Sequence, residues 1–209
     1  MTSGTTPDPS EILLKSIFTL SKNLKGIPFP VAVKISSGYS VIPFDNTNSY
    51  DNELAHALEN SLQRFLETIK SSQPRFKGTR INDVGRKIEP QLVHELDKSP
   101  ISVRQLGSAG YPDIEVTYKK KISYLEIKTS SVSGKSALRY FYYTGGKKVK
   151  ADARHLLLTI FSTPDTPGFW KVENMSLSDL SRLKVSFRPE FNASKSDLGD
   201  EKAVIFSIQ

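Results

Sequence analysis

Two acidic residues and one lysine near the middle of the sequence have types and spacing suited to metal-assisted hydrolysis. Asp113 stands before one stretch of alternating polar and apolar residues, and Glu126 and Lys128 lie in the next, beyond the lysines at 119 and 120. If these two lysines form the turn of a β-hairpin, Asp113 lies opposite Glu126, with Cβ atoms roughly 4.5–5.5 Å apart. Two carboxylates that close repel each other unless a cation lies between them, and hard divalent cations prefer oxygen ligands. Lys128, on the same face of its strand, could then orient a water molecule or stabilise charge at phosphorus.

The expected hairpin also has an apolar side. Its strands are predicted at 113–118 and 122–128, in a register that places Tyr118 opposite Lys121. Side chains alternate between the two faces of a strand. One face therefore collects the apolar residues Ile114, Val116, Leu125 and Ile127. We expect this face to join the core and the charged face to carry the site.

The segment Pro112-Asp113, followed after twelve residues by Glu126-Ile127-Lys128, resembles the motif of the PD-(D/E)XK nuclease superfamily. The resemblance covers roughly residues 82–161. It implies an α/β fold with a restriction-endonuclease-like core, in which a mixed central β-sheet is flanked by α-helices. It also implies that Asp113 and Glu126 bind one or two Mg²⁺ ions. Lys128 would assist the water that hydrolyses a phosphodiester, leaving a 5′-phosphate.

Many members of this superfamily contribute a further acid from the helix before the Pro-Asp strand. The predicted helix 82–96 resembles that helix, and Glu89 falls on its apolar stripe, where a carboxylate is costly unless it is paired or bound to metal. We therefore predict Glu89 as a third metal ligand. An ion pair between Glu89 and Arg86 is the alternative, and Glu59 on an earlier helix is the weaker candidate. Glu115 is expected to be an exposed strand residue rather than a ligand.

The positive charge of the chain is concentrated in one stretch. The sequence has a net charge of +7, and residues 119–154 carry +8 of it while the remainder carries −1. Aromatic residues and glycines alternate with lysine and arginine in this stretch, a composition suited to phosphate, sugar and base contacts. We predict that DNA is contacted by Lys135, Ser136, Arg139, Tyr143, Lys147, Lys148, Lys150 and Arg154.

The remaining pattern predicts one domain over residues 1–209, with 1–7 as a flexible tail. Leucine and isoleucine recur at helical spacing after Asp8-Pro9 and again from Asp51 to Ile69. The region 27–48, rich in proline, glycine and serine, is expected to form loop and short strand. Further strands are predicted at 155–161, 169–172, 185–191 and 203–208, and a short helix at 177–183.

Several classes of protein are excluded by composition. The sequence has no cysteine, which rules out disulfide scaffolds and thiolate metal sites. No apolar run is long enough to span a membrane, and no signal peptide is visible. Gly134-Lys135-Ser136 is not a phosphate-binding loop, because Thr129 occupies the position of the required first glycine. We therefore expect a cytoplasmic protein without a membrane partner or a nucleotide cofactor.

Together these features predict a Mg²⁺-dependent, sequence-specific endonuclease for double-stranded DNA, most similar to type II restriction endonucleases. We expect a homodimer, because a two-fold assembly matches a palindromic site and presents one active site to each strand. Two alternatives remain open at this stage. One is a structure-specific nuclease, such as a junction resolvase or a repair nuclease. The other is a non-catalytic DNA-binding module on a nuclease fold.

Overall fold

The computed structural model describes residues 8–72, 75–98, 100–107, 110–131 and 147–187. The chain divides into two compact units. The larger comprises Pro28–Leu183, and the smaller comprises residues 1–27 together with 184–209. None of the helices in the described ranges combines the length and apolar character needed to cross a membrane.

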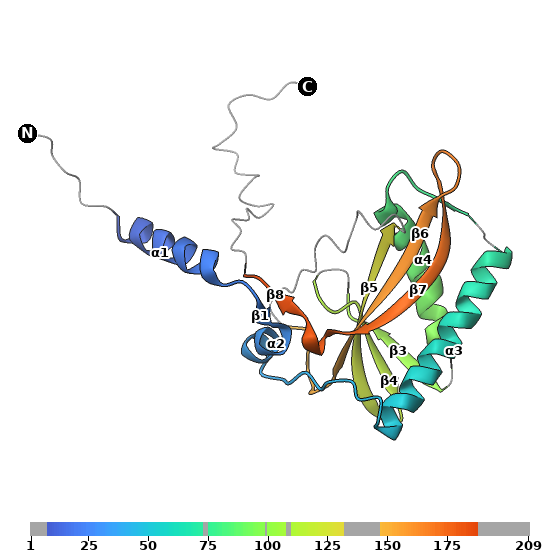
Figure 1. The fold of residues 1–209 in the computed structure, drawn as a ribbon, viewed down its shortest axis with the longest axis horizontal. Coiled ribbons are helices and arrows are strands. Elements are labelled where there is room, and N and C mark those ends of the chain that lie inside the picture. The colour runs from blue at the N-terminus through green and yellow to red at the C-terminus, as the bar shows by residue number, and fades with distance from the viewer. Residues whose placement is uncertain (1–7, 73–74, 99, 108–109, 132–146, 188–209) are drawn as a thin grey trace, which may run out of the picture. The chain divides into compact units, whose positions relative to one another are not determined.

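The larger unit is built on a six-stranded mixed sheet (Figure 1). Its strands, in the order in which they lie side by side, are β2 (Phe76–Lys77), β7 (Phe169–Asp179), β6 (Arg154–Pro164), β5 (Lys121–Ser131), β4 (Ile114–Tyr118) and β3 (Ile101–Gln105). Only β5 and β6 pair in parallel, and every other neighbouring pair is antiparallel. The predicted mixed α/β architecture with helices flanking a mixed sheet is confirmed.

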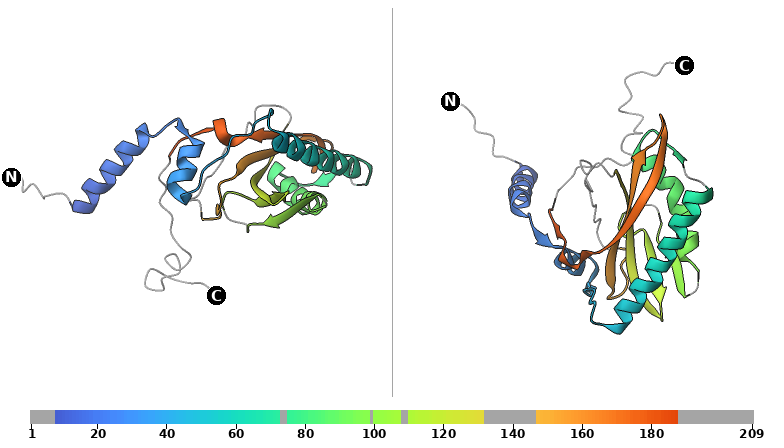
Figure 2. Two further views of the ribbon diagram at one scale, coloured as in Figure 1. Left: turned by 90° about the horizontal axis from the view of Figure 1, so that it is seen from below. Right: turned by 45° about the vertical axis from the view of Figure 1, so that its right-hand side comes forward.

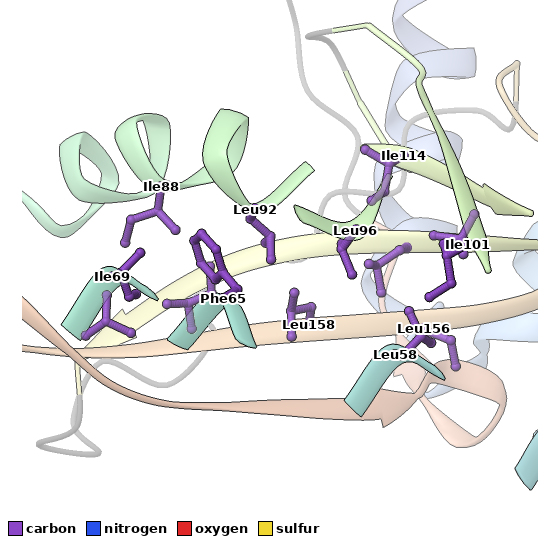
Figure 3. Packing of buried hydrophobic residues seen from close by; sticks show 14 of the residues in the cluster. Leu58, Phe65, Ile69, Ile88, Leu92, Leu96, Ile101, Ile114, Leu156 and Leu158 are labelled. Carbon is purple, nitrogen blue, oxygen red and sulfur yellow. The ribbon is translucent and has the colours of Figure 1, made fainter. Parts of the chain in front are cut away.

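Two helices cover one face of this sheet, α3 (Ser49–Ser72) and α4 (Ile81–Leu96) (Figure 2). Both were predicted, and α4 continues through the exposed Pro90. Ile88, Leu92 and Leu96 of α4 pack with residues of α3 and with Leu156 and Leu158 of β6 (Figure 3). The whole run from Arg154 to Ile160 is buried, as expected for a central strand.

The prediction of loop and short strand at 27–48 was wrong for its first part. Residues Phe29–Ser37 form helix α2, with a proline in its first turn and Gly38 at its C-terminal end. Proline presets the backbone angle of a first helical turn, and Gly38 has a φ of 82°, in the left-handed region that favours glycine. Burial of Phe29 and Val33 anchors the helix. The prolines and the glycine that suggested a loop therefore mark the ends of a short helix.

Two further expectations needed correction. Strand β7 continues to Asp179, so the predicted helix 177–183 shrinks to a 3₁₀ turn at Leu180–Arg182. The antiparallel ladder to β6 reaches as far as the pair Leu156–Asp179 and overrides the local helical pattern. Strand β3 was not predicted, and it pairs antiparallel with β4.

The smaller unit contains helix α1 (Pro9–Asn23) and a two-stranded sheet formed by β1 (Ile27–Pro28) and β8 (Lys184–Val185). Helix α1 begins as predicted, with the carboxylate of Asp8 accepting a hydrogen bond from the backbone N–H of Ser10 at 2.9 Å. Its apolar residues Leu13 and Leu20 are exposed. Of the strand predicted at 185–191, the described part ends at 187, and the segments 1–7 and 203–208 lie outside the described residues.

Candidate active site

The hairpin of β4 and β5 has the predicted register. Tyr118 pairs with Lys121 and Ile114 pairs with Leu125. The turn residues Lys119 and Lys120 both have positive φ, 45° and 64°, as a two-residue hairpin turn requires. The residues Ile114, Val116 and Leu125, which we call the core face of the hairpin, are buried in the cluster covered by α3 and α4.

The opposite side of the hairpin, which we call its site face, carries Glu115, Tyr124 and Glu126. This charged face was expected to carry the site, and all three residues are buried rather than exposed. Arg104 on β3 pairs with Glu115 through two hydrogen bonds, at 3.2 and 2.7 Å. The prediction that Glu115 is exposed was therefore wrong, although its pairing gives it a structural role rather than that of a ligand.

Asp113 lies immediately before the first residue of β4, and its carboxylate contacts the backbone of β5. Its Oδ2 accepts a hydrogen bond of 2.7 Å from the backbone N–H of Ile127. This bond fixes the Asp113 carboxylate beside the strand that carries both Glu126 and Lys128. The negative charge of Asp113 contributes to raising the pKa of Glu126, so the two predicted metal ligands do share one electrostatic environment.

Glu126 is the most unusual group in this environment. Its residue is only 3% exposed. Burial, followed by the charge of Asp113, raises the pKa of Glu126 to about 7, while Lys128 opposes the shift. The Nζ of Lys128 lies 2.5 Å from Oε1 of Glu126, and Oε2 is buried without a hydrogen-bond partner in the described structure. A buried carboxylate oxygen without a partner is costly, so a cation would relieve both the repulsion and the missing contact.

Glu89 on α4 belongs to the same group of charges. Burial first, and then the charge of Asp113, raises the pKa of the half-buried Glu89, while Lys128 lowers it. In the described part of the chain, Glu89 makes no ion pair with Arg86. Glu59, by contrast, is exposed on α3 and lies 3.6 Å from His56. Glu89 therefore lies within the electrostatic influence of Asp113 and Lys128, whereas Glu59 is exposed on α3.

Close packing between α4 and β5 brings Glu89 to the site. Gly85, one helical turn earlier on α4, faces Thr129 of β5. A Cβ atom added to Gly85 would lie 2.3 Å from Oγ1 of Thr129, far inside van der Waals contact. Gly85 was not predicted as a contact residue, although a glycine inside a helical pattern is a signal for such close approach.

The number of carboxylates among these residues suits a divalent cation such as Mg²⁺. No three acidic or imidazole groups converge into a finished metal-binding cluster anywhere in the described ranges. Mg²⁺, however, is commonly held by one or two carboxylates together with water and substrate phosphate oxygens, rather than by an all-protein cage. Asp113 and Glu126, with its unpartnered oxygen, provide that number of carboxylates.

Lys148 has a different position from the one predicted. Its Nζ donates hydrogen bonds to the carbonyl oxygens of Gly107, Gly110 and Pro112, at 3.0, 2.6 and 2.9 Å. An ammonium group has three donors, so all of them are engaged in holding the loop that leads into Asp113. Lys148 was predicted to contact DNA. It does not have the position expected for that role, because its ammonium group faces the protein backbone. That charge also lowers the pKa of Glu126.

Arg154 also turns inward. It is 7% exposed and forms an ion pair with Asp51, which is completely buried. Its guanidinium lies 4.7 Å from the ring centre of Tyr50. A guanidinium enclosed in this way is not available to a phosphate, so the structure departs from the predicted role of Arg154 in DNA contact. Lys147 and Lys150 are exposed, and Lys135, Ser136, Arg139 and Tyr143 lie outside the described residues.

A buried pair supports the loop before Asp113 from behind. The hydroxyl of Tyr111 is 2.6 Å from Nδ1 of His155, and the two rings stack with centres 5.7 Å apart. Burial lowers the pKa of His155 to about 4, so the imidazole is neutral near pH 7. His155 is thereby enclosed as a structural residue, and Tyr111 is the partner of its Nδ1.

Comparison with known proteins identifies the family of the chain. The Type II restriction enzyme MjaV family matches residues 21–202 of the chain. The protein named Type II restriction enzyme MjaV, from Methanocaldococcus jannaschii, is 30% identical over 206 residues, which cover 88% of this chain and 89% of the relative. The chain therefore belongs to the type II restriction enzyme MjaV family, and its enzyme class is that of site-specific deoxyribonucleases.

Proposed function

We propose that this chain is a Mg²⁺-dependent endonuclease of the PD-(D/E)XK type that cuts double-stranded DNA at a specific sequence. The observation that carries the proposal is the buried carboxylate of Glu126. It lies beside Asp113 and Lys128, and one of its oxygens has no partner in the described structure. Within a family of restriction enzymes, such a group is best explained as a cation ligand. The hairpin, α4 and the parallel β5–β6 pair would then form a restriction-endonuclease-like core.

In this proposal Asp113 and Glu126 hold one or two Mg²⁺ ions and Glu89 supports them. The ion supplies Lewis-acid stabilisation of the charge that develops on the phosphate oxygens. Lys128, one third exposed on its side chain, is placed to hold the attacking water. Water attacks phosphorus, the bond to the 3′ oxygen breaks, and the products carry a 3′-hydroxyl and a 5′-phosphate.

Glu126 has a physical reason to lose its proton when metal binds. The pKa of Glu126 is about 7 without a cation, so binding of a divalent ion near pH 7 would release protons from this cluster. Lys128 already stabilises the ionised form of Glu126. Lys128 thus compensates for the repulsion between Glu126 and Asp113 until the ion arrives, and it is then free to turn toward water.

The DNA contacts are proposed in the basic stretch after β5. Lys147 and Lys150 are exposed and can reach a phosphate, and Lys135, Ser136, Arg139 and Tyr143 complete the predicted set. We further propose a homodimer, because double-strand cleavage at a two-fold symmetric sequence needs one active site for each strand. Its place of action would be the cytoplasm, where DNA that enters a cell is met.

The first experiment is incubation of a long unmethylated DNA with the purified protein, in Mg²⁺ and in EDTA. Discrete fragments that appear only with Mg²⁺ are the expected result. Sequencing of the fragment ends, together with their ligation, tests the 5′-phosphate. Glu89→Gln should slow cleavage strongly while Glu59→Gln, a matched change on α3, leaves it unchanged. Absence of cleavage with any divalent metal would contradict the proposal.

A further inference from the structure

A second concentration of positive charge lies next to the active site, outside the basic stretch. It surrounds a groove of about 450 Å³ formed by β2, the first turns of α4 and the loop between β6 and β7. Three cationic residues, Lys77, Arg86 and Lys87, line the groove together with a single acid, Asp83. We call this feature the basic groove.

The one acid of the basic groove is occupied by the start of α4. Asp83 accepts hydrogen bonds from the backbone N–H of Arg80 and from the hydroxyl of Thr79, both at 3.0 Å. The backbone bond from Arg80 lowers the pKa of Asp83 most strongly, and the bond from Thr79 comes next. The charge of Arg86 also lowers this pKa, and it has the smallest effect. The carboxylate therefore serves as a helix cap, and its single negative charge stands against three positive charges in the groove.

The cations of the basic groove keep their charge available. Among the described residues, no carboxylate lies within ion-pair distance of Lys77, Arg86 or Lys87. The contrast with the nearby loop is clear, since Arg75 and Lys171 both pair with Asp165 at 2.8 Å. The Nζ of Lys87 donates to the carbonyl oxygen of Lys77 at 2.6 Å, which holds the ammonium in place and leaves two of its protons free.

Part of the wall of the groove is bare backbone. The N–H of Gly78 donates to the carbonyl oxygen of Gly168 at 2.9 Å, and Gly168 has a φ of 78°. Gly78 cannot carry a side chain without rearrangement, because a Cβ there would lie 3.0 Å from Cβ of Asp83. Two glycines side by side remove the bulk that would keep a polymer backbone at a distance.

The basic groove and the active site follow one another along α4. Arg86 and Glu89 are three residues apart, which places their Cβ atoms roughly 5–6 Å from each other on one side of the helix. Between consecutive phosphates, one strand of duplex DNA advances about 3.4 Å along its axis. A strand whose scissile phosphate lies at the active site would therefore bring a neighbouring phosphate to the groove.

We propose that the basic groove binds the phosphates of the DNA strand that flank the cut, and that it does so without reading bases. This inference rests on the proposed endonuclease function. Lys77 and Arg86 provide the contacts, Lys87 the supporting charge, and the two glycines the room for the sugar-phosphate backbone. The groove thereby fixes the position of the strand on α4.

The test compares Lys77→Ala/Arg86→Ala with wild type, both as full chains in EDTA, by fluorescence anisotropy over a series of salt concentrations. Each phosphate contact contributes about 0.9 to the slope of log affinity against log salt. The variant should therefore lose about 1 to 2 from that slope, and bind at least about tenfold more weakly in low salt. Duplexes with and without the cleavage sequence should lose affinity equally, because phosphate contacts carry no sequence information.

A charge-matched control is Lys25→Ala/Lys70→Ala, which removes two exposed lysines, one after α1 and one on α3, both outside the basic stretch. It should retain the wild-type slope. Single neutral methylphosphonates placed beside the mapped cut provide a second readout on the wild-type protein, and they should weaken binding at the phosphates that reach the groove. An unchanged slope in Lys77→Ala/Arg86→Ala, in a protein that still cuts DNA, would overturn the proposal that the groove binds phosphates. A wild-type protein that cuts no DNA would instead overturn the endonuclease proposal.

Discussion

The two faces of the β4–β5 hairpin are both enclosed by the protein, yet they contain opposite chemistry. On the core face Ile114, Val116 and Leu125 pack among aliphatic side chains from α3, α4 and β6. On the site face the buried residues include Glu115 and Glu126, each with a cationic partner. The same two strands therefore supply stability on one side and an incompletely paired group of charges on the other.

The difference between the faces lies in how completely their groups are satisfied. Aliphatic side chains gain free energy from burial in proportion to area. Glu115 is compensated by the two hydrogen bonds from Arg104. Glu126 is compensated only in part, since one of its oxygens lacks a partner among the described residues and its pKa is raised to about 7. Buried charges that the protein leaves incompletely paired mark functional positions.

The largest effect should come from removing charge from the site face. Lys128→Ala should reduce the rate of Mg²⁺-dependent cleavage by about 10³-fold, because a preorganised cation no longer orients the attack. Asp113→Asn should do the same through loss of a metal ligand. Neither change should weaken DNA binding in EDTA by more than a few fold. Single-turnover cleavage and anisotropy separate the two quantities, and a Lys128→Ala protein that cuts at the wild-type rate would remove this residue from the site.

The core face should respond in stability and not in chemistry. Leu125→Ala should lower the free energy of unfolding by about 2–5 kcal/mol, the range for a leucine truncated in a core. Glu126→Gln, the adjacent residue on the site face, should leave the free energy of unfolding near that of wild type while abolishing cleavage. Urea unfolding of both variants provides the measurement. Equal destabilisation by the two changes would mean that the faces do not divide stability and function in this way.

The free energy of unfolding should depend on pH through His155, the buried histidine behind the site. The pKa of His155 is lowered from 6.5 to about 4 by burial, so the unfolded chain binds a proton that the folded chain lacks between these values. The contribution of this group to stability is therefore present above about pH 6.5 and is lost as the pH falls toward 4, by on the order of 2–3 kcal/mol. Because carboxyl groups also titrate there, the quantity to measure is the difference in unfolding free energy between wild type and His155→Gln at pH 7 and at pH 4.5. A difference that is constant with pH would contradict the assignment.

The smallest effect is expected for a substitution at the contact between α4 and β5. In an exposed helix, glycine to alanine stabilises by up to about 1 kcal/mol. Gly85→Ala should instead destabilise by about 1–3 kcal/mol, because its new Cβ would meet Oγ1 of Thr129. Adding Thr129→Ala removes that atom and should restore both stability and cleavage. A stabilising Gly85→Ala would show that α4 tolerates a wider spacing than the structure has.

Local patterns were sufficient for the hairpin. Alternation along two short strands and a two-residue turn determine which side chains share a face, so the register and the core face were predicted correctly. Helix α2 and strand β3 were missed for the opposite reason. Each is short and depends on a tertiary contact. Phe29 of α2 contacts the distant Tyr111, and β3 exists through its pairing with β4.

The sequence alone determined the identity and order of Asp113, Glu126 and Lys128 and the sign of the charge around them, because residue type and strand periodicity are local properties. Only the tertiary structure decided which cations face outward. Lys148 reaches Gly110, 38 residues away in the chain, and Arg154 pairs with Asp51 on another element, so both turn inward. Lys77 and Arg86 stay available because the nearby acids are occupied. Asp165 pairs with Arg75 and Lys171, and Asp83 caps the start of α4. Composition counts such charges equally, and only their neighbours in space determine which of them can meet DNA.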